Sequence, residues 1–176
     1  KGGKIAIGLD EGDELIGVLL TDGHKEIIIA SASGNAVKFT EEGARTMGRT
    51  ARGVIGIKLR GDDRVVGVVA AEEGKHFLTI TELGYGKRSE FDDFRLMKSR
   101  GGMGVMCHNV TERTGRVAGI AAVDENDDIM IITDSGTIIR TAVDSIPVYG
   151  RSAAGVIVMR VGEGQTCAGF TTVPKA

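Results

Sequence analysis

The sequence predicts an all-β, propeller-like fold made of repeated units of about 50 residues with about four short strands each. The first observation is that three glycine landmarks recur with spacings of 50 to 52 residues. They are Gly3, Gly53, Gly104 and Gly155, then Gly17, Gly67, Gly119 and Gly169, and then Gly34, Gly84 and Gly136. The repeats therefore span about 1–49, 50–100, 101–151 and an incomplete 152–176, and together form a single domain over 1–176.

The second observation is that each unit reads as short apolar or β-branched runs separated by Gly, Asp and Asn turns. The expected strands are 4–9, 14–20 and 25–31 in the first unit, 53–59, 64–71 and 75–81 in the second, and 104–110, 116–122 and 128–133 in the third. A weaker fourth run follows Gly84, and a short turn of helix is expected near 92–96. No sustained helical period is present elsewhere, which favours antiparallel sheets.

Stacking is required because a single four-stranded unit has two apolar faces and cannot bury both alone. About three and a half units predict a partial ring or arc. Either a neighbouring unit donates the strands missing from the last repeat, or the arc is open, with exposed faces prone to self-association.

Composition excludes several classes of protein. The chain has 176 residues, 26% of them charged, and no apolar run near the roughly 20 residues of a membrane helix. The two cysteines, Cys107 and Cys167, provide neither a disulfide framework nor a zinc site and suit a reducing compartment. The chain does not begin with Met and shows no targeting leader, so we expect a piece of a longer cytoplasmic protein.

The net charge of −2 conceals an uneven distribution. Arg49, Arg100 and Arg151 share one phase of the repeat, and Lys38, Arg88 and Arg140 share another. Further cations lie between or beside these two phases, namely Arg45, Arg52, Lys87, Arg95 and Lys98. Because stacking places equivalent positions on one edge, we expect a curved basic band, whose natural partner is the phosphate backbone of duplex DNA. The windows 35–60, 85–104 and 137–160, which hold all of these cations, contain few aromatic residues for stacking on single strands.

Several segments resemble the carboxy-terminal domain of the A subunit of bacterial DNA gyrase, with the A subunit of topoisomerase IV as the close relative. They read Met-Gly-Arg-Thr-Ala-Arg-Gly-Val at 47–54, Gly-Tyr-Gly-Lys-Arg at 84–88, Arg-Gly-Gly-Met-Gly-Val at 100–105 and Ser-Gly-Thr-Ile-Ile-Arg-Thr at 135–141. A further match is Gly150-Arg151 followed by Gly155-Val156. The resemblance covers essentially the whole chain and suits the later blades of that domain.

The resemblance implies a six-bladed β-pinwheel whose neighbouring blades exchange strands and whose positive rim wraps duplex DNA. Wrapping lets the holoenzyme, which also contains the rest of the A subunit and the B subunit, introduce negative supercoils with ATP and Mg²⁺ bound in other parts. It implies rim contacts at Lys38, Arg49, Arg88, Arg100, Arg140 and Arg151, with Lys87, Arg45, Arg52, Arg95 and Lys98 as secondary candidates. One departure is that the family's Gln-Arg-Arg-Gly-Gly-x-Gly box has only a degenerate counterpart, at 99–104.

Catalytic, cofactor and metal sites are not expected in this chain. His24, His76 and His108 have no triad or metal spacing, and the latter two fall in predicted strands. The Asp124-x-Asn126-x-Asp128 run lacks the Gly and Glu of a calcium loop. The alternative to DNA binding is a propeller that serves as a protein-interaction platform, with cations that serve only solubility.

Overall fold

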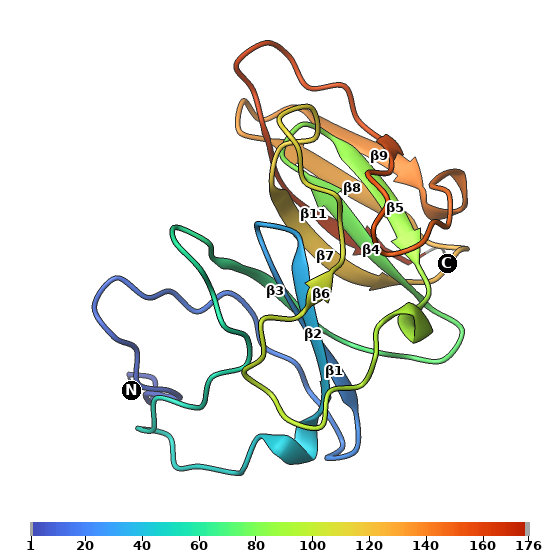
Figure 1. The fold of residues 1–176 in the computed structure, drawn as a ribbon. Coiled ribbons are helices and arrows are strands. Elements are labelled where there is room, and N and C mark those ends of the chain that lie inside the picture. Colours follow the sequence, from blue (N-terminus) through green and yellow to red (C-terminus); the bar gives the residue numbers. More distant parts are fainter. Residues whose placement is uncertain (1, 175–176) are drawn as a thin grey trace.

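The computed structural model describes residues 2–174, and these form antiparallel sheets joined by long loops (Figure 1). The strands are β1 Glu26–Ser31, β2 Asn35–Thr40, β3 Val65–Ala70, β4 His76–Thr81, β5 Tyr85–Ser89, β6 Val105–Met106, β7 Val117–Val123, β8 Asp128–Thr133, β9 Ile138–Ala142, β10 Val156–Ile157 and β11 Cys167–Val173. Three short 3-10 turns follow strands β2, β5 and β9, namely η1 Glu41–Gly43, η2 Phe91–Asp93 and η3 Val143–Ser145. The predicted all-β class is confirmed.

Each sheet takes strands from more than one repeat. The first sheet has the order β3-β1-β2-β6, the second β10-β5-β4-β7, and the third β11-β8-β9. In the first two sheets a hairpin of one unit (β1–β2, β4–β5) pairs with a long strand of the next unit and a two-residue strand of the unit after it. Strands are therefore exchanged between units, but the third sheet has only three strands among residues 2–174, so the strands missing from the last repeat are not donated there.

Some of the expected strands are confirmed and others are not. The runs 25–31, 64–71, 75–81, 116–122 and 128–133 match β1, β3, β4, β7 and β8, and the weak run after Gly84 is β5. The runs 4–9 and 14–20 were wrongly predicted, because neither pairs with a described strand. The run 53–59 makes one isolated β-bridge, from Ile57 to Gly102. Of the run 104–110, only Val105 and Met106 form a strand, which is β6.

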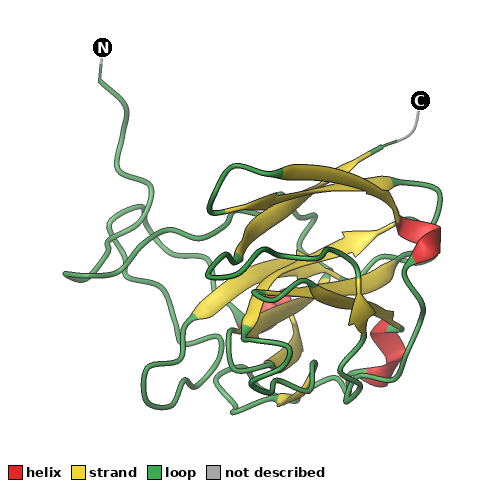
Figure 2. Ribbon diagram, turned by 90° about the horizontal axis from the view of Figure 1, so that it is seen from above, coloured by secondary structure: helices red, strands yellow, loops and turns green. Residues whose placement is uncertain are grey.

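The surroundings of the N-terminal segment explain why the strand predicted at 14–20 does not form. Leu15, Ile16 and Val18 occupy the same phase as β3, but they are exposed and have no sheet to join among residues 2–174. Figure 2 shows this N-terminal stretch extending away from the sheets. An apolar run becomes a strand only where a partner edge supplies its hydrogen bonds.

Neighbouring sheets pack through their long strands, β3 on β7 and β7 on β11. This packing explains why glycine recurs at the position of Gly67, since a Cβ there would lie 2.7 Å from the Ile120 side chain. Gly119 faces Phe170 in the equivalent way, at 3.1 Å. The glycine thus removes the side chain that would hold adjacent sheets apart.

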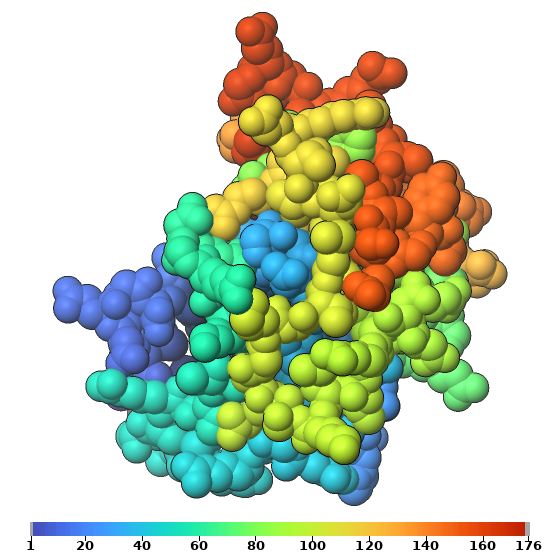
Figure 3. All heavy atoms as spheres, viewed as in Figure 1, coloured from blue at the N-terminus to red at the C-terminus, as the bar shows by residue number. Residues whose placement is uncertain are grey.

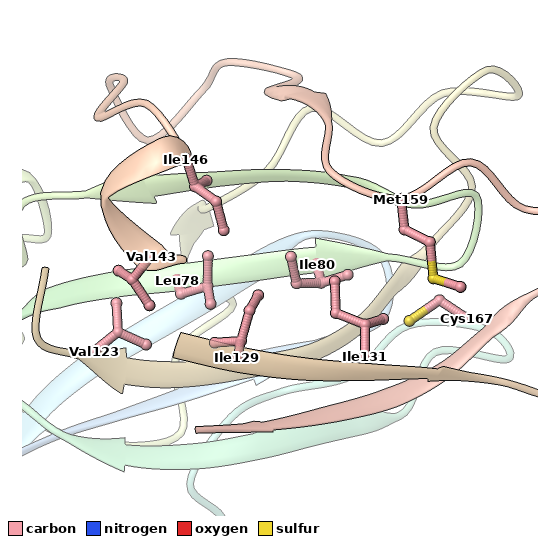
Figure 4. Packing of buried hydrophobic residues seen from close by; sticks show 9 residues of the cluster. All are labelled: Leu78, Ile80, Val123, Ile129, Ile131, Val143, Ile146, Met159 and Cys167. Atoms are coloured by element: carbon pink, nitrogen blue, oxygen red, sulfur yellow. The ribbon is translucent and has the colours of Figure 1, made fainter. Parts of the chain in front are cut away.

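The largest core cluster lies between the second and third sheets (Figure 4). It consists of Leu78, Ile80, Val123, Ile129, Ile131, Val143, Ile146, Met159 and Cys167. A second cluster is centred on Phe77, whose ring lies 5.0 Å from Phe94 and 6.1 Å from Phe91 between ring centroids. Within the described residues, no helix is long and apolar enough to span a membrane.

Candidate nucleic-acid interface

Three loops in equivalent positions carry most of the cations that the sequence singled out. We call 44–53, 95–104 and 146–155 the first, second and third edge loops, and they follow η1, closely follow η2, and follow η3, respectively. None contains an Asp or Glu. Their cations are Arg45, Arg49, Arg52, Arg95, Lys98, Arg100 and Arg151.

The second and third edge loops run along the same edge of successive sheets. In the second loop, Leu96 forms an isolated parallel β-bridge with Lys38 of β2, and the amide of Met97 donates to the Lys38 carbonyl at 2.8 Å. In the third loop, Val148 forms an isolated parallel β-bridge with Arg88 of β5, and the amide of Tyr149 donates to the Arg88 carbonyl at 2.8 Å. Figure 3 shows the second loop, in yellow-green, crossing in front of the blue β1–β2 hairpin. Stacking thus places the two basic loops at matching sheet edges.

Six of the seven loop cations are available to a ligand. Arg45, Arg49, Arg95 and Lys98 are exposed, and none of them forms an ion pair with a residue in the range 2–174. Arg100 and Arg151 are half-buried and each is anchored by one branch, with Nη1 donating to the carbonyl of Ile55 (3.3 Å) or Met106 (3.2 Å). These two acceptors are 51 residues apart, so the anchor is itself repeated.

Anchoring matters because a guanidinium has five N–H donors. One branch that binds a carbonyl fixes the direction of the group and leaves other donors for a phosphate. The side chain then loses less rotamer freedom when a ligand binds.

Three of the predicted contacts are buried, so the expectation that they belong to an exposed band was wrong. Lys38, Lys87 and Arg88 are 6%, 0% and 6% exposed. Lys38 pairs with Glu26 at 2.7 Å and donates to the carbonyl of Phe91 at 3.2 Å. Arg88 donates through Nε to the carbonyl of Ile146 at 2.6 Å. These cations join one hairpin to the turn that follows the next.

Lys87 is held entirely by neutral groups. Its ammonium donates to the Ser89 hydroxyl at 2.9 Å and to the carbonyls of Gly150 and Arg151 at 3.0 and 2.9 Å. Burial lowers the pKa of Lys87 to about 8, because removing the charged form from water is costly. Val37 and Ile139 occupy the equivalent positions in the other hairpins, a signal that this position faces the core.

Two further predicted residues are exposed but paired with carboxylates. Arg52 Nη1 lies 2.7 Å from Asp10, and Arg140 Nε lies 2.6 Å from Asp128. Their charge is partly neutralised, so they add less to the basic surface than the six available cations do. Acid also gathers in a hollow of about 320 Å³ beside Lys38, lined by Glu26, Glu72, Glu73, Glu90 and Asp92 among others.

The structure adds two cations that the repeat did not indicate. Lys58 and Arg60 are exposed next to the second edge loop. The amide of Lys58 donates to the Gly102 carbonyl at 2.9 Å, and Arg60 Nη2 lies 3.0 Å from Met103 Sδ. Both fall in a basic stretch of the sequence, 45–60, but they lie outside the shared phases of the cations. The local density of positive charge was therefore the signal that could have found them.

His108, which the sequence placed in a strand, lies just beyond the end of β6 and has a structural contact. His108 is buried, and its Nδ1 lies 2.8 Å from the Thr79 hydroxyl. Burial and the nearby Lys87 lower the pKa of His108 to about 4. Across residues 2–174, no group of three or more His, Cys, Asp or Glu side chains is arranged to hold a metal ion.

Comparison with known proteins gives a consistent result. The family model described as DNA gyrase C-terminal domain, beta-propeller, matches 1–22, 25–72, 75–124 and 127–174. The DNA gyrase A subunit of Salmonella typhimurium is 48% identical over 98% of this chain, and that of Escherichia coli is 44% identical over the same share. The chain spans about a fifth of the length of these relatives, since it covers 20% of each.

Solved structures agree on the fold. A DNA gyrase A C-terminal domain has a TM-score of 0.88 and 26% identity, over 97% of this chain and 58% of that one. The C-terminal domain of DNA topoisomerase IV also has a TM-score of 0.88, at 24% identity, over 96% of this chain and 52% of that one, and this likeness shows the fold alone. From the family match over nearly the whole chain, together with the repeated sheets, we conclude that this chain belongs to the DNA gyrase C-terminal domain family of β-propeller repeats.

Proposed function

We propose that this chain is a non-catalytic module that binds and bends duplex DNA within a type IIA topoisomerase, as part of the A subunit of a DNA gyrase. The observation that carries the proposal is the set of carboxylate-free edge loops with six available cations, four of them on the second and third loops, which run along matching sheet edges. Phosphates are the partners that such a row suits, because neutralising them releases condensed counterions whatever the base sequence.

The proposal includes bending of the bound duplex. Bending a 20–30 bp site by 40–90° costs on the order of 1–6 kcal/mol, which several phosphate contacts along an arc can offset. In the holoenzyme, with the rest of the A subunit and with the B subunit, the bent segment would support negative supercoiling in the bacterial cytoplasm. ATP and Mg²⁺ would be bound by other parts of the enzyme.

Gyrase is favoured over topoisomerase IV as the parent enzyme. The curated relatives at 44–48% identity are gyrase A subunits, while the structural likeness is equal for both enzymes. A protein-interaction platform is the other candidate, and the two functions differ in how binding responds to salt.

The test is a binding series with the 176-residue chain on mixed-sequence duplexes of increasing length, followed by ligation of nicked circles in its presence. We expect affinity to rise with duplex length, to fall steeply with salt, and the ligated circles to show a shift in linking number of one sign. Absence of binding at low salt, or binding that ignores salt, would favour the platform. The chain alone should neither nick nor relax DNA nor hydrolyse ATP.

A further inference from the structure

We propose that Lys87 is a positioning residue whose ammonium group holds the third edge loop against β5 and so fixes Arg151 for contact with DNA. This inference rests on the proposed function, because it concerns how one cation of the same surface is held in place. It also makes DNA affinity depend on pH, since the ammonium can lose a proton.

The ammonium group of Lys87 lies beneath the third edge loop and donates hydrogen bonds to its backbone. Lys87 is completely buried, and two of its three donated hydrogen bonds end on the loop, at the Gly150 and Arg151 carbonyls. The third ends on Ser89, whose own hydroxyl donates to the Tyr149 carbonyl at 2.8 Å. Three consecutive loop carbonyls therefore depend on Lys87 or on its neighbour Ser89.

This arrangement is absent from the equivalent junction one repeat earlier. There Val37 stands in place of Lys87 and has no donor to offer the second edge loop. Arg100 is instead held by its own side chain, because its Nε donates to the Gly43 carbonyl at 2.8 Å in addition to the hydrogen bond from Nη1 to the Ile55 carbonyl. Among residues 2–174, the Arg151 side chain donates only to the Met106 carbonyl. Arg151 thus relies on the ammonium beneath its backbone.

An ammonium supplies three donors and a neutral amine only two, so deprotonation leaves one of the three acceptors unbonded. The pKa of Lys87 is lowered by burial to about 8, with the Asp93 carboxylate acting to raise it and the Arg151 guanidinium to lower it. His108 also lies within reach of the Lys87 charge, but its pKa of about 4 keeps it neutral near pH 8.

The thiols stay protonated in the same range. Burial raises the pKa of Cys107 to about 12 and raises that of Cys167. Of Lys87, His108, Cys107 and Cys167, Lys87 is therefore the group that changes charge between pH 7 and 9, and about nine in ten molecules would carry it neutral at pH 9.

The experiment measures the affinity of the 176-residue chain for one mixed-sequence duplex from pH 7 to pH 9 at fixed ionic strength. For the unmodified chain we expect a loss of about fivefold with a midpoint near pH 8, the size of one net hydrogen bond. Arg151→Ala should weaken binding at pH 7 and abolish the pH dependence, because the positioned group is gone. Lys98→Ala, which removes an exposed cation from the second loop, should weaken binding but keep the fivefold loss.

Lys87→Met should bind at pH 7 about as weakly as Arg151→Ala, and the double variant should be no weaker than either. Should Lys87→Met fail to fold, the comparison of Arg151→Ala with Lys98→Ala still decides, since both changes are on the surface. A pH-independent affinity in the unmodified chain, or a pH loss that persists in Arg151→Ala, overturns the inference. Absence of DNA binding at pH 7 would instead overturn the proposed function.

A measurement without DNA provides an independent check. The lysine ¹³Cε signals of the chain should include one that titrates near pH 8 and is missing from Lys87→Met. If every lysine signal titrates above pH 10, the ammonium does not change charge in the range that the inference requires.

Discussion

Removing three of the available loop cations should flatten the salt dependence of DNA binding by a calculable amount. The logarithm of the observed binding constant falls with the logarithm of salt concentration with a slope of about −0.9 per neutralised phosphate. Six contacts, one for each of Arg45, Arg49, Arg95, Lys98, Arg100 and Arg151, give a slope of about −5.4. Between 50 and 200 mM salt the affinity should then fall by about 10³-fold.

The triple variant Arg45→Ala, Arg49→Ala and Arg95→Ala leaves three contacts and a slope of about −2.7, so the same change in salt should cost only about 40-fold. The assay is fluorescence anisotropy with a labelled mixed-sequence duplex. These three side chains are exposed, so the fold should survive the substitutions.

The matched control removes the same net charge elsewhere. Lys25, Arg64 and Lys75 are already paired with Asp22 (3.8 Å), Glu82 (3.3 Å) and Glu72 (2.7 Å), and all three lie outside the edge loops. Replacing all three by Ala should leave the slope near about −5.4. If this control flattens the slope as much as the loop variant does, then net charge and not the edge loops governs binding, and the reasoning is refuted.

Three predictions concern stability. Gly84 and Gly136 both have φ near +80°, but a Cβ on Gly84 would lie 2.0 Å from the Met159 carbonyl oxygen, whereas Gly136 faces open space. Gly136→Ala should therefore cost about 1 kcal/mol and Gly84→Ala clearly more, as measured by urea unfolding; equal costs would mean that the close approach is unimportant. Phe77→Ala should lower the free energy of unfolding by about 3–5 kcal/mol, since Phe77 is fully buried among aromatic rings, and a loss under about 1 kcal/mol would contradict that packing. The pKa of His108 is lowered from 6.5 to about 4, so the unfolded chain binds more protons between these values; stability should fall by about 3 kcal/mol as the pH drops from 6.5 to 4, and His108→Gln should remove this part of the acid sensitivity in melts at both pH values.

The sequence predicted the strands that pair within their own hairpin or with the next long strand. β1, β3, β4, β7 and β8 lie where the apolar runs placed them, because alternation of side chains and turn residues is local information. The run 14–20 has the same pattern and forms no strand, since pairing depends on an edge that residues 2–174 do not offer it. Pattern predicts the capacity to form a strand, and partners decide the outcome.

For the candidate interface, the repeat spacing predicted correctly where the basic loops lie, but it did not predict which of the repeated cations are exposed and which are buried. Arg100 and Arg151 share a phase and also share an anchor, each to a carbonyl 45 residues earlier in its own repeat. Lys38, Arg88 and Arg140 share another phase, yet the first two are buried and the third is exposed. In the first two sheets the turn after the next hairpin covers this position and accepts a hydrogen bond at Phe91 or Ile146.

By itself, the order of residues determined that this protein is periodic, that its units are built from short strands, and that its cations recur in loops free of acid. Those properties depend on neighbours a few residues away, or on spacing along the chain. Only the tertiary structure decided which strands are exchanged and which cations reach solvent. Both depend on what an adjacent sheet covers. The ammonium group of Lys87, for example, donates to the carbonyls of Gly150 and Arg151, which are brought to it from 63 and 64 residues away by the packing of one repeat on the next.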